Sequence, residues 1–159
     1  MTTGWLTNIL ANGNVVDAGG ATVSKSLFKA GLKALPAQYQ QNPALLQNFI
    51  SFNNKVEYQD TLANRVGGLG DTMTQNGPGT DPNPLYAYNM MVKGVGLMPA
   101  ANGIMTNPKN LIFGIHRQVS LEFTKNIQTR TYIIVLTGRV DFAVEEPLAT
   151  IGYENIGAA

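Results

Sequence analysis

Apolar residues recur at helical spacing in the N-terminal part of the chain. One stripe between Val23 and Pro36 predicts an amphipathic helix. Thr22 or Ser24 is a suitable N-cap, and Pro36 ends or kinks the helix because proline has no backbone N–H. The stripe consists of Leu27, Phe28, Leu32 and Leu35.

Three neighbouring segments are read in the same way. Residues 1–22 predict a short helical or irregular segment and then a loop. Pro43 suits the first position of a second helix, which continues to Ile50. A third helix is predicted from Lys55 to Val66, with Val56 and Leu62 facing inward, and the glycines that follow it stop it.

The C-terminal part changes to strict alternation of apolar and polar residues, which predicts strands. We expect the stretch from Thr131 to Val144 to be the stability core, with Ile134 and Phe142 buried. The predicted helices lie in the first part of the chain and the predicted antiparallel strands in the second, and this order predicts an α+β fold. The other predicted strands cover 86–95, 104–106, 111–115, 119–123 and 149–153, and residues 107–110 predict a turn.

Composition restricts the class of function. The chain has 159 residues, 44% hydrophobic and only 13% charged, and the charged fraction is far below the roughly 25% of an average soluble domain. A sparsely charged surface favours self-association. The net charge of +1 gives no field to attract nucleic acid, and the absence of cysteine excludes disulfides and thiolate metal sites. We see no membrane span or secretion signal, so a cytoplasmic product is expected.

Candidate catalytic groups do not form a pattern. His116 is the single histidine and is read as a strand residue rather than a base or metal ligand. The glycines before Asp71 follow a helix, so they are read as a helix stop and not as a phosphate loop. Glu145 and Glu146 are adjacent on a strand and point to opposite faces. We therefore predict no enzyme activity, no cofactor and no metal site.

Residues 70–84 are rich in Gly, Pro, Asn, Asp and Thr and predict a long loop. Loops of this length are uncommon unless they have a function. We interpret this one as a candidate inter-subunit contact loop. Its candidate residues are Asp71, Thr74, Asn76, Gly77 and Pro78.

The stretch from Thr106 to Val144 begins TNPKNLIFGIHR and ends GRVDFAV, followed by EEP. It resembles the C-terminal signature of tailed-phage major capsid proteins. Upstream, Gly4-Trp5-Leu6, Ala34-Leu35-Pro36 and Leu69-Gly70-Asp71 match the family in order, whereas Asn83-Pro84-Leu85 replaces its Gly-Val-Pro-Val strand. The resemblance implies signature positions at Asn107, Pro108, Asn110, Arg117, Arg139, Asp141 and Glu145.

The resemblance implies the Hong Kong 97-type capsid fold, with a spine helix and a mostly antiparallel sheet. It places the spine helix at 23–39, inside a peripheral segment that covers 1–42. The axial domain would cover 43–108, and strands in 109–159 would return to the peripheral domain. The family's N-terminal arm and extended loop have no counterpart in the sequence, which implies a fragment of the subunit or a split or truncated gene.

The implied function is that of a structural shell subunit, made in the host bacterial cytoplasm and located in the virion. Its implied partners are copies of itself in pentamers and hexamers, together with scaffold, protease and portal proteins. Packaged DNA would be contacted without sequence specificity, and no membrane is involved. Two alternatives remain: an encapsulin-like compartment subunit, and a small α+β ligand-binding domain or enzyme.

Overall fold

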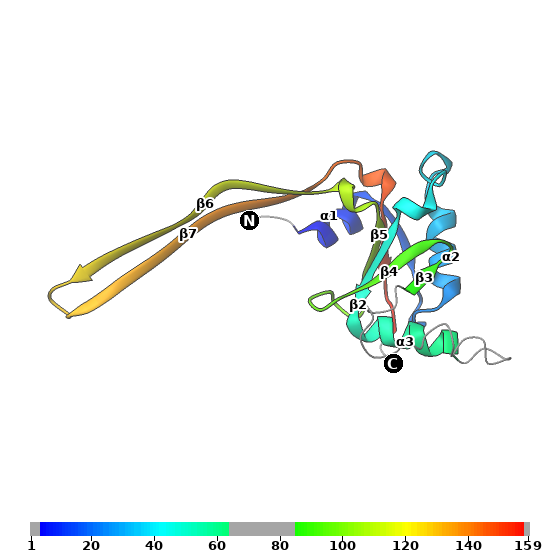
Figure 1. Cartoon of the computed structure of the whole chain (residues 1–159), viewed down its shortest axis with the longest axis horizontal. Helices are drawn as coiled ribbons and strands as arrows, with labels where there is room; N and C mark the ends of the chain where they lie inside the picture. The colour runs from blue at the N-terminus through cyan, green and yellow to red at the C-terminus, as the bar shows by residue number, and fades with distance from the viewer. Residues whose placement is uncertain (1–3, 64–84, 158–159) are drawn as a thin grey trace, which may run out of the picture.

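The structure, a computed structural model, describes residues 4–63 and 85–157, without the side chains of residues 63, 117 and 118. It consists of a body built on one sheet and a long two-stranded hairpin that projects from it (Figure 1). None of the helices in the described part of the chain combines the length and the apolar content that a membrane crossing requires.

The body sheet has six strands in the order β1-β8-β5-β2-β4-β3. The pairs β1–β8 and β2–β4 are parallel, and the other three pairs are antiparallel. The sheet takes strands from all three of the sequence ranges above, and the division into peripheral and axial parts stays a prediction. The strands are β1 (Asn14–Asp17), β2 (Gln47–Ser51), β3 (Leu85–Ala87), β4 (Met90–Val95), β5 (Gly103–Thr106) and β8 (Ile151–Glu154).

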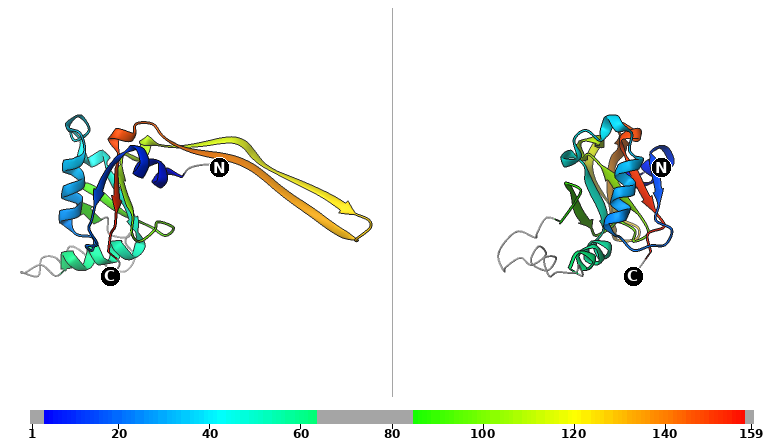
Figure 2. Two further views of the ribbon diagram at one scale, coloured as in Figure 1. Left: turned by 180° about the vertical axis from the view of Figure 1, so that it is seen from behind. Right: turned by 90° about the vertical axis from the view of Figure 1, so that its right-hand side faces the viewer.

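Helices α1 (Trp5–Asn12) and α2 (Lys25–Ala34) cover opposite faces of the sheet. Adjacent residues of β8 show this, because neighbours on a strand point to opposite faces. Gly152 faces Leu10 of α1, whereas the ring of Tyr153 faces Gly31 of α2. Figure 2 shows α2 on the side of the body away from the hairpin and α1 beside the hairpin root.

The core lies between α2, α3 (Phe52–Ala63) and the sheet. Phe28 meets Tyr58 and Tyr153 edge-on, with ring centroids 5.1 and 6.1 Å apart. Tyr58 donates a hydrogen bond to the carbonyl oxygen of Tyr86, 3.2 Å away, which ties α3 to β3. Ile50 and Met105 complete this centre and are fully buried.

The first predicted helix is confirmed but is shorter than expected. It starts after Ser24 and ends at Ala34, and a separate 3₁₀ turn covers Ala37–Tyr39. Leu35 is already extended, as the residue before a proline prefers. The equivalence of α2 to a spine helix stays a prediction.

The predicted helix from Pro43 to Ile50 is wrong. A 3₁₀ turn (Pro43–Leu45) leads into β2, a central strand that pairs with β4 and β5. Pairing on both edges and burial of Asn48 and Ile50 decide the structure here. A short apolar run cannot reveal these long-range contacts.

Two further predictions need correction. The third helix begins at Phe52 rather than Lys55. Leu62 packs against the core as predicted and Tyr58 is buried, whereas Val56 is half exposed. The predicted strand 86–95 is a hairpin of β3 and β4. Tyr88 and Asn89 turn it with φ values of 50° and 67°, the positive values that a two-residue hairpin loop requires.

The projecting hairpin consists of β6 (Leu111–Asn126) and β7 (Thr131–Val144). The bounds predicted for β7 are confirmed, and the two strands predicted within 111–123 form one strand with register shifts between Ile115 and Ser120. The expectation that this region is the stability core is wrong, because Ile134 is 65% exposed and Phe142 is only partly buried. The predicted final strand is confirmed as β8, after 3₁₀ turns at Pro108–Asn110 and Pro147–Ala149.

Candidate functional site

Asn110 joins the two ends of the long hairpin at its root. Its side-chain oxygen accepts from the backbone N–H of Glu146 at 2.7 Å, and its side-chain nitrogen donates to the carbonyl oxygen of Glu146 at 2.9 Å. The carbonyl oxygen of Asn110 also accepts from the N–H of Glu145 at 3.1 Å. These contacts fix the start of β6 against the end of β7.

Asn107 and Pro108, the other residues of the Asn-Pro signature, form the turn that precedes β6. Asn107 accepts from the N–H of Lys109 at 3.1 Å, and Pro108 occupies the first position of the 3₁₀ turn. The side-chain nitrogen of Asn110 also donates to Thr106 at 3.3 Å. A side-chain oxygen at the cap and proline at the first turn position are both favourable at a helical start.

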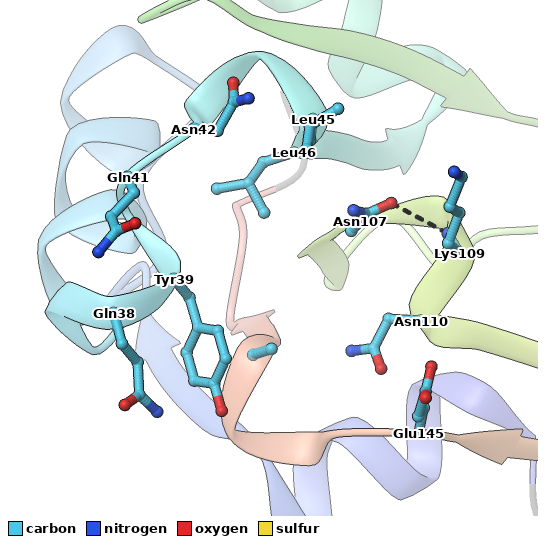
Figure 3. Close-up of a pocket in the computed structure, with 11 residues that line it drawn as sticks. Gln38, Tyr39, Gln41, Asn42, Leu45, Leu46, Asn107, Lys109, Asn110 and Glu145 are labelled. Atoms are coloured by element: carbon cyan, nitrogen blue, oxygen red, sulfur yellow. Dashed lines mark hydrogen bonds between the residues drawn. The ribbon is translucent and has the colours of Figure 1, made fainter.

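A hollow of about 380 Å³ lies beside this root, shown in Figure 3. Lys109 and Glu145 are the only ionic side chains among the described residues that line it. The remaining walls are mostly amides, Tyr39 and two leucines, which suit hydrogen bonding rather than acid–base chemistry. The amide-bearing residues of the lining are Gln38, Gln41, Asn42, Asn107 and Asn110.

An aromatic cluster holds the hairpin root on α1. The ring of Trp5 meets Phe142 edge-on at 5.0 Å, and Phe142 lies 5.3 Å from Phe113 on the paired strand. The indole N–H of Trp5 donates to the carbonyl oxygen of Ile112 at 3.0 Å. The sequence pattern did not indicate Phe113, and its alternation predicted that Phe142 belongs to the core. The single tryptophan near the chain start was the only available signal.

Beyond this cluster the hairpin is amphipathic. Cross-strand partners share a face, so Leu121 lies beside Leu136 and Phe123 beside Ile134. Tyr132 extends this face toward the hairpin tip, where the amine of Lys125 lies 5.7 Å from its ring centre. We call Leu121, Phe123, Tyr132, Ile134 and Leu136 the apolar face, and every member is more than half exposed.

The opposite face of the same segment is mixed and largely polar. Ser120 and Thr137 hydrogen-bond across the strands at 2.6 Å, and the next partners are Glu122 with Val135 and Thr124 with Ile133. Ile133 and Val135 are 46% and 44% exposed, against 76% for Phe123 on the apolar face. The hairpin therefore gathers its most exposed large apolar side chains on one face, and nothing in the described chain covers either face.

The structure distributes the predicted site residues unevenly. Asn107, Pro108, Asn110 and Glu145 meet at the hairpin root. Arg139 pairs in register with Arg117 on the hairpin, and Asp141 accepts from the N–H of Phe142 at 2.9 Å. The candidate contact residues Asp71, Thr74, Asn76, Gly77 and Pro78 lie outside the described residues.

The residues weighed for catalysis do not converge. The side chain of His116 is exposed on β6, at the register shift between Ile115 and Arg117. Glu146 caps the turn at Pro147–Ala149 through the N–H of Leu148 at 3.2 Å, a role that the sequence analysis missed. Among the described residues, no three His, Asp or Glu side chains gather as a metal site would need. The glycines weighed as a phosphate loop lie outside the described part.

Comparison with known proteins gives a consistent result. No protein-family model matches the chain. A prophage capsid protein of Bacillus subtilis (strain 168), YqbE, is 34% identical over 148 residues, which cover 86% of this chain and 46% of that protein. The chain therefore spans about half the length of the curated relative that it matches.

Solved structures show the same fold at low sequence identity. A structure from Mycobacterium phage Che8 matches with a TM-score of 0.62 and 12% identity, over 94% of this chain and 56% of that one. The capsid of an empty GTA particle matches with a TM-score of 0.60 and 16% identity, over 92% of this chain and 50% of that one. A virus-like particle from Pyrococcus furiosus matches with a TM-score of 0.56 and 11% identity, over 92% of this chain and 58% of that one. The chain has the α+β Hong Kong 97-type capsid fold, and its sequence is similar to that of a prophage capsid protein.

Proposed function

We propose that the protein is a structural subunit of a phage head shell, a major capsid protein that assembles through pentamers and hexamers into an icosahedral capsid around DNA. The observation that carries this proposal is the 34% identity to a prophage capsid protein, which the shared capsid fold supports.

The exposed hairpin supports an assembly role. An isolated two-stranded hairpin is at best marginally stable in water, and this one also exposes an apolar face. Contiguous apolar surface on a soluble protein usually marks an interaction site. A subunit whose hairpin is covered in the assembled shell explains both features.

The same proposal covers partners and location. The shell would lie in the virion after synthesis in the host cytoplasm, with scaffold, protease and portal proteins as further partners. A net charge of +1 gives no field that attracts nucleic acid, so packaged DNA would be contacted only without sequence specificity. Catalysis has no part in this function, in keeping with the capsid relative and with a hairpin-root hollow lined mostly by amides.

An encapsulin-like compartment is the second candidate, since a virus-like particle shares the fold at a TM-score of 0.56. The two functions differ in content and in gene neighbourhood. A phage shell encloses DNA and is encoded beside portal, protease and terminase genes. A compartment encloses a protein cargo that is encoded beside it.

The test is expression of the complete reading frame that encodes the chain. We expect rings or closed shells by negative-stain microscopy and a mass far above one subunit by light scattering. Nuclease-protected DNA in shells from induced lysogens would identify a phage head, and an enclosed protein would identify a compartment. A product that remains strictly monomeric under all conditions would contradict the proposal.

A further inference from the structure

We draw no further inference here: the strongest candidate, the exposed apolar face of the β6–β7 hairpin, carries nothing because no contact in the described part of the chain shows what covers it.

Discussion

The phenolic oxygen of Tyr153 fills the space that a Cβ atom on Gly31 would occupy. Gly31 lies in the middle of α2, where glycine costs about 1 kcal/mol relative to alanine. The position keeps glycine because the Tyr153 ring, fully buried on β8, must approach the helix backbone. The helix–sheet contact thus depends on a missing side chain, which a hydrophobic pattern does not reveal.

We predict that Gly31→Ala destabilises the protein, although alanine is the better helix former. Displacing a buried ring costs about 1–3 kcal/mol, which exceeds the helix gain of about 1 kcal/mol. Denaturant unfolding should show a lower midpoint. The loss should shrink when Tyr153→Phe removes the clashing oxygen. A stabilised Gly31→Ala variant would show that the helix and β8 separate easily.

A second prediction compares two isoleucines on the same chain. Ile50 is fully buried in β2, whereas Ile134 is 65% exposed on the hairpin. Ile50→Ala should lower the free energy of unfolding by about 2–5 kcal/mol. Ile134→Ala should change it by less than about 0.5 kcal/mol, as for an ordinary surface site. Urea titrations of both variants test the body as the stability core, and a loss for Ile134→Ala as large as that for Ile50→Ala would contradict it.

The difference in burial between Ile50 and Ile134 shows which features of the fold the sequence could predict. Alternation along 131–144 predicted the bounds of β7, because a period of two follows from strand geometry alone. Whether a face is covered depends on what packs on it, and Ile134 has the same local pattern as a buried residue. Similarly, the apolar run at Leu45, Leu46, Phe49 and Ile50 fits helix and strand equally well. Pairing with β4 and β5, which are distant in sequence, decided for the strand.

The candidate site was predictable to a similar degree. The family resemblance pointed to Asn107, Asn110 and Glu145, which meet at the hairpin root. It did not indicate their local role, since the hydrogen bonds of Asn110 to Glu146 join positions 36 residues apart. The apolar face was also missed, because the alternation of the distal hairpin was taken as a sign of burial.

We predict that Asn110→Ala loosens the hairpin root. The change leaves the N–H and the carbonyl of Glu146 without the Asn110 side chain, at a cost of about 1–3 kcal/mol for partly buried groups. Hydrogen exchange should accelerate at the Glu146 amide. Asn126→Ala is the control, because Asn126 accepts from the N–H groups of Gln128 and Thr129 at the hairpin tip. If both variants lose the same stability, the root contacts have no special role.

The last prediction concerns alkaline pH. Burial raises the pKa of the Tyr153 phenol far above its ordinary value of 10.0, so the folded protein keeps it protonated. The unfolded chain ionises this group above about pH 10 and binds fewer protons than the folded state, so stability falls as pH rises. The loss from this one group approaches about 1.4 kcal/mol for each pH unit above 10 while the folded phenol stays protonated.

Urea unfolding of Tyr153→Phe at pH 8 and at successive values above 10 measures this contribution. At pH 8 the variant should lose about 1 kcal/mol, because Tyr153 no longer donates to Asn48, 3.2 Å away. Above pH 10 its stability should fall less steeply than that of the wild type. Tyr132→Phe on the exposed hairpin is the matched control and should keep the wild-type slope. Parallel slopes for Tyr153→Phe and the wild type would mean that the phenol is accessible to water in the folded state, and that the packing of β8 on α2 is looser than its edge-on contact with Phe28 indicates.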